Sequence, residues 1–342
     1  MARPSSSTPD PPVTISVVFV HGLLSGVRSR GLPCDAFLAD AGIDPALLEQ
    51  AGARVTAAQY VGLFRSLTDR LDDDLLGFLP RPLRHGSFAL VVRSAAAEDT
   101  LERAMRRTAR TFGLLQTDFE LELVRAGDLA GFTLRFTDPS LAQSVPLHEL
   151  LLRVLWRLFA WLAGGKLPVA RFDFAFPSPS YASSYGKIFT APLRFEQQRS
   201  GFWFDADTLT RPVRRDKAAV KAYLADARAN VILPPRDGDL TGARVRRHLQ
   251  QAQPEWPDLA ATAEALHMAA STLQKRLAAD GTSFQALKDA LRPDLAIVRL
   301  HTSAVPLVAL ADELGFADSA AFQRAFKSWT GSAPGAYRRG GV

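Results

Sequence analysis

Residues 307–338 read LVALADELGFADSAAFQRAFKSWTGSAPGAYR, and this stretch decides the fold of the C-terminal part of the chain. Its apolar residues recur at helical spacing as far as Gly315, a residue type that commonly ends helices. Asp318 is a good N-cap for a second helix over 319–329. The stretch therefore predicts two short helices joined by a tight turn, which is a helix–turn–helix unit.

The second of these helices has two different faces. Phe322, Phe326 and Trp329 are spaced to point inward together. Glutamine can pair with adenine in the major groove of DNA, and arginine or lysine can pair with guanine. The outward face carries such donors, and its polar residues are Ser319, Gln323, Arg324 and Lys327.

A similar arrangement precedes this one, because Leu273 and Leu277 stand 49 residues before the inward pair Phe322 and Phe326. Asp258 is the N-cap of the preceding helix. The outward residues of this earlier unit are Ser271, Gln274 and Lys275. Two such units, joined by a helix at about 283–301, predict an all-α domain over 239–342 with two helices for successive major grooves. A plain helical bundle has the same periodicity and is the alternative.

Residues 257–339 strongly resemble the AraC-family DNA-binding domain, most specifically in the run ELGFADSAAFQRAFKSWTGSAPGAYR. The resemblance implies sequence-specific binding of double-stranded promoter DNA. It places Ser271, Gln274 and Lys275 on a first recognition helix. It places Ser319, Gln323 and Arg324 on the second, with Arg324 the strongest candidate for a base contact. Lys327 is either a phosphate contact or a solvated side chain.

The chain departs from the family pattern in the first unit and its connection. Pro293 stands where the family usually continues its linking helix with a charged residue, and Asp294 follows it. Proline removes a backbone donor, so we expect a kink or a restart of that helix. Ala269 replaces the usual small polar N-cap of the first recognition helix. The resemblance therefore supports base reading by this half less strongly.

The preceding residues mix helical and strand patterns and predict an α+β domain over 13–228. We expect a disordered tail over 1–12, which is rich in Pro and Ser, and a linker over 229–238, where prolines break any helix. Helices are predicted at 16–30, 35–41, 57–71, 86–95, 98–115, 146–163 and 214–228. Strands are predicted at 119–123 and 132–136, around a turn at Gly127 and Asp128, and at 168–176, 192–196 and 201–205.

This domain resembles, more loosely, the N-terminal domain of the ornithine-utilisation-regulator-like branch of AraC regulators. The similarity lies in GARVTAAQYVGLFRSL, RPLRHGSFALVVRSAAAEDTLERAMRRTARTFGLL, HELLLRVLWRL and PLRFEQQRSGFWFD. It implies effector sensing and dimerisation, with a pocket bounded by 118–136, 168–176 and 146–163, although no effector-contacting residue is assigned. We expect a homodimer controlled by a small-molecule effector, activation rather than repression, and RNA polymerase as a further candidate partner. An N-terminal domain that binds a protein instead of a metabolite is the alternative.

Several patterns argue against an enzyme, a cofactor or a metal. The single cysteine, Cys34, excludes a disulfide framework and thiolate zinc sites, and the six histidines are not at metal-ligand spacing. Ile15–Gly26 resembles the start of an α/β-hydrolase, but the chain has no Gly-x-Ser-x-Gly elbow. Gly164-Gly165-Lys166 follows a predicted helix and reads as its terminator. No apolar run reaches membrane length, so we expect a cytoplasmic protein.

Charge permits a nucleic-acid partner without requiring one. The 342 residues carry a formal net charge of +6. Residues 239–342 hold twelve Lys and Arg against ten Asp and Glu. DNA binding by this part must therefore depend on where its cations are placed, and we expect marked salt dependence.

Overall fold

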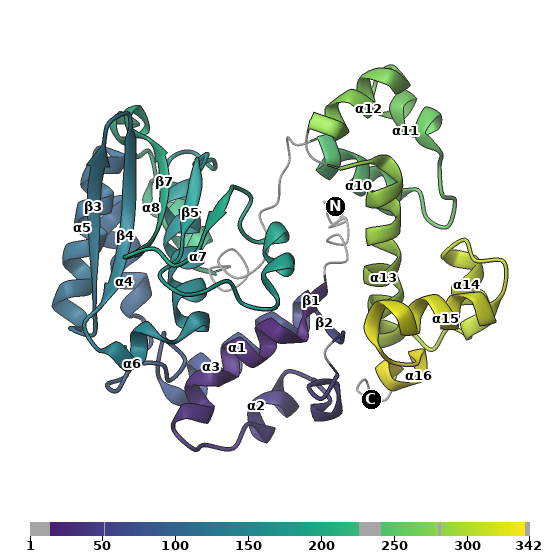
Figure 1. Ribbon diagram of the computed structural model, residues 1–342, viewed down its shortest axis with the longest axis horizontal. Coiled ribbons are helices and arrows are strands. Elements are labelled where there is room, and N and C mark those ends of the chain that lie inside the picture. The colour runs from purple at the N-terminus through teal and green to yellow at the C-terminus, as the bar shows by residue number, and fades with distance from the viewer. Residues whose placement is uncertain (1–13, 51, 226–240, 280–281, 339–342) are drawn as a thin grey trace, which may run out of the picture. The chain divides into compact units, whose positions relative to one another are not determined.

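The computed structural model describes residues 14–50, 52–225, 241–279 and 282–338. By internal contacts the chain divides into two units. The first combines Met1–Val17, Gly42–Tyr60 and Arg236–Val342, and the second combines Val18–Ala41 and Val61–Pro235. The predicted tail 1–12 and linker 229–238 lie outside the described residues. The predicted class, an α+β part followed by an all-α part with two helix–turn–helix units, is confirmed (Figure 1).

The second unit contains a five-stranded sheet in the order β3-β4-β7-β5-β6. The predicted hairpin is confirmed, with its turn at Gly127 (φ +60°) and a register that runs from Phe119 opposite Phe136 to Ala126 opposite Leu129. The β5–β6 pair is parallel, and the other pairs are antiparallel. The strands are β3 (Phe119–Ala126), β4 (Leu129–Phe136), β5 (Arg171–Asp173), β6 (Leu193–Arg194) and β7 (Ser200–Asp205).

Helix α7 (Val145–Leu162) packs on this sheet through aromatic rings. Phe159 meets Phe132 of β4 with ring centroids 4.8 Å apart, and Trp156 meets Phe172 of β5 at 5.3 Å. All four side chains are buried. These ring contacts lie between α7 and strands that were predicted to bound the effector pocket. They do not assign an effector site, and the pocket stays a prediction.

Six other helices of this part follow the predicted spans closely. They are α1 (Val17–Ser29), α2 (Asp35–Asp40), α3 (Ala57–Leu71), α4 (Ser87–Ala96), α5 (Leu101–Leu115) and α8 (Lys217–Ala225). The four-residue helix α6 (Pro139–Ala142) was not predicted. Short 3-10 helices lie at η1 (Pro45–Leu47), η2 (Ala182–Lys187) and η3 (Ala206–Thr210). Gly164 and Gly165 have φ values of +96° and +107°, and the Gly165 N–H donates to the carbonyl of Ala160. These two glycines therefore end α7, as predicted.

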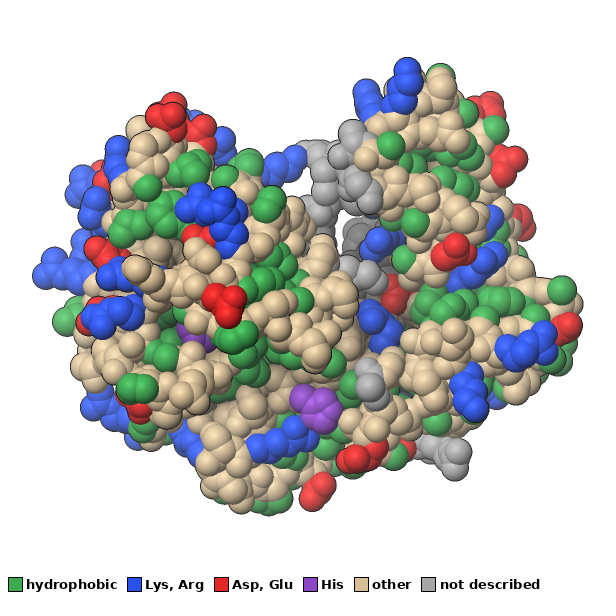
Figure 2. Space-filling model, in the orientation of Figure 1, with side chains coloured by type: hydrophobic (Ala, Val, Ile, Leu, Met, Phe, Trp, Pro, Cys, Tyr) green, Lys and Arg blue, Asp and Glu red, His purple; other side chains and the backbone are tan. Residues whose placement is uncertain are grey.

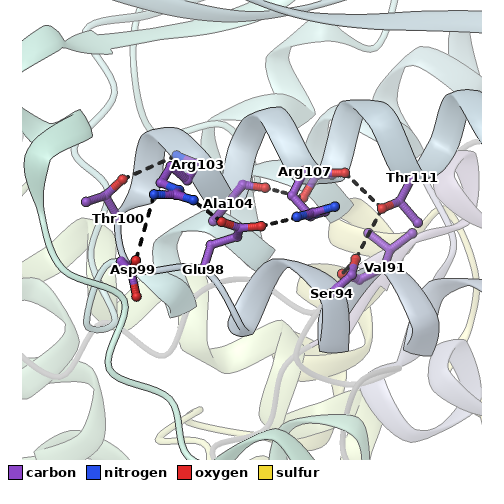
Figure 3. Close-up of polar contacts among 10 residues, drawn as sticks. Val91, Ser94, Glu98, Asp99, Thr100, Arg103, Ala104, Arg107 and Thr111 are labelled. Atoms are coloured by element: carbon purple, nitrogen blue, oxygen red, sulfur yellow. Dashed lines mark hydrogen bonds and ion pairs between the residues drawn. The ribbon is translucent and has the colours of Figure 1, made fainter.

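The arginine-rich face of α5 is solvent-exposed, and several of its arginines are paired. Glu98, in the turn between α4 and α5, accepts from Arg107 (2.7 Å) and Arg103 (3.2 Å) (Figure 3). The bond from Arg107 is the main cause that lowers the pKa of Glu98. The Thr100 hydroxyl caps the helix by accepting from the Arg103 N–H. These contacts explain the arginine cluster as local surface pairing.

The first unit combines a two-stranded ribbon with the C-terminal helices. Strands β1 (Thr14–Ser16) and β2 (Arg54–Thr56) are antiparallel, with Ile15 opposite Val55. Neither strand was predicted, because three residues are too few to show period-two alternation. The sequence pattern predicted a helix from Ser16 and a domain over 13–228 that includes this ribbon. The helices are α10 (Thr241–Gln251), α11 (Leu259–Ala265), α12 (Ala270–Ala279), α13 (Phe284–Thr302), α14 (Leu307–Glu313), α15 (Ser319–Thr330) and α16 (Pro334–Arg338).

Helix α13 links the two helix–turn–helix units and does not restart at Pro293. It is assigned as one helix of 19 residues with the proline inside. The expectation of a restart was therefore wrong. The helix is held on both sides of the proline by apolar packing, since Leu291 and Ile297 are buried to 1% and 0% exposure.

Candidate nucleic-acid interface

The first helix–turn–helix unit is α11 and α12, packed against α10 and α13. The Asp258 carboxylate caps α11 by accepting from the Ala261 N–H at 2.8 Å, as predicted. The helix ends at Ala265 with Leu266 as its C-cap, and the next residue, His267, has a left-handed backbone (φ +57°). Leu273 and Leu277 of α12 are buried to 0% and 1% exposure, so the predicted inward face is confirmed. The surrounding core consists of Val245, Leu249, Ala263, Leu287 and Leu291.

The residues predicted to read DNA from α12 are on its outer face. Ser271, Gln274 and Lys275 are all exposed, one turn or less apart. Ala269 lies immediately before the helix, and its carbonyl accepts from the Leu273 N–H. Alanine has no side-chain acceptor for a first-turn N–H, so α12 begins without the side-chain cap seen in α15.

The second helix–turn–helix unit is α14 and α15. The Asp318 carboxylate accepts from the Ala321 N–H at 2.6 Å, and Gly331 (φ +77°) ends α15. Phe322 and Phe326 are fully buried, with ring centroids 5.7 Å apart. Trp329 is half-buried and contacts the rings of Phe316 and Phe326. The predicted inward face is therefore confirmed.

The outer face of α15 carries the other predicted residues. Gln323, Arg324 and Lys327 are exposed. Ser319 is half-buried, and its hydroxyl accepts from Gln323 Nε2 at 3.2 Å. This bond orients the glutamine amide along the helix before any DNA is bound. Figure 2 shows basic side chains over α12 and over α15.

The two candidate reading helices have the same side-chain register. Gln274 and Lys275 follow the buried Leu273, as Gln323 and Arg324 follow the buried Phe322. Because a helix face is fixed by the buried residues, each glutamine–cation pair leaves its helix in a corresponding direction. An amide beside a cation provides donors for adenine and guanine edges in both units.

A contact that was not predicted from the sequence joins the two helix–turn–helix units. Trp256, before α11, donates its Nε1–H to the carbonyl of Glu313 at the end of α14 (2.8 Å). Arg292 of α13 donates to the carbonyl of Leu314 (3.2 Å) and lies over the rings of Trp256 and Phe316. These groups bind the free carbonyls at the C-terminus of α14. A tryptophan in the polar stretch Pro-Glu-Trp-Pro was the available signal.

Arg299 adds a second connection between α13 and α14. Its guanidinium donates two hydrogen bonds to the carboxylate of Glu313, at 2.9 and 2.7 Å. The bond to Glu313 raises the pKa of Arg299 further above its ordinary value. Lys288 lies over the ring of Trp256, and burial lowers the pKa of its amine. Arg292, Arg299 and Lys288 therefore support the arrangement of the helices, whereas Lys275, Arg324 and Lys327 face outward.

The described parts of the chain show no cluster of three or more His, Cys, Asp or Glu residues able to hold a metal. Cys34 is a free, half-buried thiol. His21 lies in α1, inside the predicted helix 16–30, and its Nδ1 accepts from Arg28 (2.8 Å). Among the described helices none is long and apolar enough to cross a membrane.

Comparison with known families matches two segments of the chain. Residues 31–213, more than half of the chain, match the family described as the arabinose-binding N-terminal domain of AraC transcription regulators. Residues 262–340 match a helix-turn-helix domain family, and they include both α12 and α15. The resemblance inferred from the sequence is thereby confirmed for both parts.

Curated relatives are similar over half of the chain or more, and one is similar over nearly its whole length. The ornithine utilization regulator of Pseudomonas aeruginosa is 30% identical over 331 residues, which cover 95% of this chain and 96% of the relative. The transcriptional regulator VqsM of the same organism is 28% identical and covers 54% of this chain and 57% of the relative. The crystal structure of the P. aeruginosa regulator CdpR is 20% identical, covers 94% of this chain and 97% of that chain, and has a TM-score of 0.34. The first relative is named as a regulator, and VqsM is named as a helix-turn-helix-type transcriptional regulator.

Proposed function

Because the chain belongs to the AraC family of DNA-binding transcription regulators, we propose that α12 and α15 read promoter DNA under the control of a small-molecule effector. The observation that carries this proposal is the repeated register of the two helices. Gln274 and Lys275 on one, and Gln323 and Arg324 on the other, project from equivalent positions next to a buried anchor. The protein is a regulator rather than an enzyme.

Within the two helices we assign different roles to the exposed cations. Arg324 lies beside Gln323 on the exposed face of α15, and we assign it to a guanine edge. Lys327 lies one turn further along α15, toward the C-terminus, and we assign it to a phosphate. The rest of the proposed contact set is Ser271, Gln274, Lys275, Ser319 and Gln323. Phosphate contacts position the protein, whereas the base contacts supply specificity.

We assign effector binding to the α+β unit. Support comes from the family match over 31–213, whose description refers to an arabinose-binding domain. One relative is named for ornithine utilization, so free ornithine and related amino acids are the first ligands to test. An effector would shift the population of DNA-competent molecules by binding one state more tightly than the other.

The proposed oligomeric state, direction of regulation and location follow from promoter binding. A homodimer would present two copies of the reading helices and raise affinity without new kinds of contact. We propose activation through contact with RNA polymerase, and action in the cytoplasm, where bacterial promoters are. A promoter-fusion assay tests this proposal, and repression of the promoter is the opposite outcome.

The first experiment is binding of full-length protein to duplex DNA from upstream of its own gene, followed by fluorescence anisotropy with excess random competitor DNA. Binding that resists the competitor supports a sequence-specific regulator. If the competitor abolishes binding, selection from a random DNA library with the full-length protein follows. Failure to enrich any sequence, with and without ornithine and a panel of amino acids, contradicts sequence-specific reading.

A further inference from the structure

The β1–β2 ribbon contacts the linking helix α13, although it comes from the start of the chain. Asp294 of α13 is buried to 4% exposure and accepts a hydrogen bond from the Thr14 hydroxyl, 280 residues away. The guanidinium of Arg54 lies 3.9 Å from the same carboxylate. Both of these partners belong to the ribbon. A buried carboxylate without compensation is costly, so the contact holds the ribbon on α13.

Arg54 also fixes the two strands to each other. Its Nε donates to the Thr14 hydroxyl at 2.6 Å, and its Nη2 donates to the Thr14 carbonyl at 2.7 Å. Thr14 and Arg54 are neighbours on adjacent strands, because Arg54 pairs with Ser16 and Thr14 pairs with Thr56. One guanidinium therefore closes the ribbon and presents it to Asp294.

The same ribbon also contacts α16, which packs against the buried face of α15. The backbone N–H of Arg54 donates to the Tyr337 hydroxyl of α16 at 3.1 Å. Tyr337 is fully buried, and its ring meets Phe326, the inward anchor of α15, at 5.1 Å. Gly52 lies so close to the end of α15 that a Cβ there would stand 3.0 Å from the carbonyl carbon of Thr330. The ribbon is therefore packed between the linking helix and the base of the second reading helix.

The ribbon is also joined directly to two helices of the N-terminal part. β1 ends at Ser16 and α1 begins at Val17, while β2 ends at Thr56 and α3 begins at Ala57, so neither junction has a loop. Movement of either helix start must be passed to the strand that precedes it. The departure of the sequence from the family pattern at Pro293 and Asp294 falls where the ribbon packs.

We propose that Thr14 and Arg54 are positioning residues for DNA binding, and that the ribbon carries regulation from the N-terminal part of the chain to α13 and α15. The inference rests on the proposed DNA-reading function. With the ribbon packed on Asp294 and Tyr337, α13 and α16 are fixed and α15 is held for specific binding. When the ribbon is released, the phosphate contacts remain but the fixed arrangement needed for a specific site is lost.

The test compares full-length wild type with Arg54→Ala, Arg54→Lys and Asp294→Asn on a duplex selected by the wild-type protein, and on random duplex. We expect Arg54→Ala and Asp294→Asn to weaken binding to the selected duplex by at least about fivefold. Binding to random duplex should change by less than about twofold, because coupling acts on the specific complex. Arg54→Lys should restore part of the loss.

Arg30→Ala is the matched control. Arg30 lies 3.9 Å from the buried Asp73 and also donates to two backbone carbonyls, all within the second unit. The Arg30→Ala substitution therefore removes the same charge and a similar ion pair at a place away from α13. Equal effects of Arg30→Ala and Arg54→Ala, or equal losses on both duplexes, overturn the proposal in favour of a general effect on folding. Unchanged specific binding by Arg54→Ala also overturns it. If wild type selects no sequence, the proposed function has failed instead.

Discussion

His267 and Gly315 have the same left-handed backbone at equivalent points of the two helix–turn–helix units, with φ values of +57° and +71°. Each residue directly follows the C-cap residue of its helix, which is Leu266 in one unit and Leu314 in the other. The next residues, Met268 and Phe316, donate N–H groups to the carbonyls of Ala263 and Ala311, both at 2.9 Å. The two helix ends are therefore the same structure, built with glycine in one unit and histidine in the other.

Exchanging the residue type at these two positions should have opposite effects. His267→Gly should raise the free energy of unfolding by about 0.5–1 kcal/mol, because a side chain is unfavourable in this backbone region. Gly315→Ala should lower it by about 1 kcal/mol. The loss at Gly315 comes from the backbone, since a Cβ there would be 3.5 Å from Trp256, an ordinary contact distance. Chemical denaturation of full-length protein measures both. A stabilising Gly315→Ala would contradict the argument.

The second prediction concerns the base contact assigned to Arg324. Arg324→Ala should cost about 1–3 kcal/mol on a selected duplex and relax base preference at one position. Lys327→Ala should instead weaken binding to all duplexes alike and reduce the slope of affinity against salt. Competition with single-base variants of the selected duplex separates the two effects. An equal loss on random DNA for Arg324→Ala would show that it contacts phosphate.

Residues with local signals were predicted well from the sequence. The apolar spacing around Leu273 and Phe322, and the caps Asp258 and Asp318, placed the four helices of the two units near their observed bounds. The reading faces of α12 and α15 follow from the same spacing, because burying one face exposes the other. The family resemblance then assigned the exposed residues to DNA.

Long-range contacts had no local signal. Thr14 and Arg54 are ordinary strand residues until Asp294 is placed next to them, and Asp294 reads as one more exposed helix charge. The bond from Trp256 to a backbone carbonyl was equally hidden, since a carbonyl has no sequence identity. Pro293 predicted a kink or a restart because propensity was considered alone, whereas α13 is one helix with buried neighbours on both sides of the proline.

The third prediction tests the connection between the two helix–turn–helix units. Trp256→Phe removes the Nε1–H that binds the Glu313 carbonyl and retains an aromatic ring next to Arg292. We expect unfolding to become easier by about 1 kcal/mol. Specific binding should weaken more than random binding, because the two reading helices lose part of their fixed spacing. Denaturation and anisotropy on the same preparations measure these effects.

Trp329→Phe is the control for this substitution. Trp329 packs on Phe316 and Phe326, and within the described residues its indole nitrogen has no hydrogen-bond partner. The same change of residue should therefore leave the specific-to-random ratio closer to that of wild type. A larger loss of specificity in Trp329→Phe than in Trp256→Phe would argue against the role given to the Trp256 bond.

The last prediction is a pH dependence of stability in the α+β unit, from the buried His148 of α7. Its Nε2–H donates to the Ala142 carbonyl (2.9 Å), and in the neutral ring its Nδ1 accepts from the Ser200 hydroxyl (2.7 Å). Burial lowers the pKa of His148 below its ordinary value of 6.5. The unfolded chain therefore binds a proton in a pH range where the native state does not, so stability falls as pH drops through about 6.5.

Urea midpoints between about pH 5 and 7 should show a steeper loss of stability toward acid in wild type than in His148→Gln, which cannot titrate. Parallel pH profiles for the two proteins would show that His148 is not the group responsible.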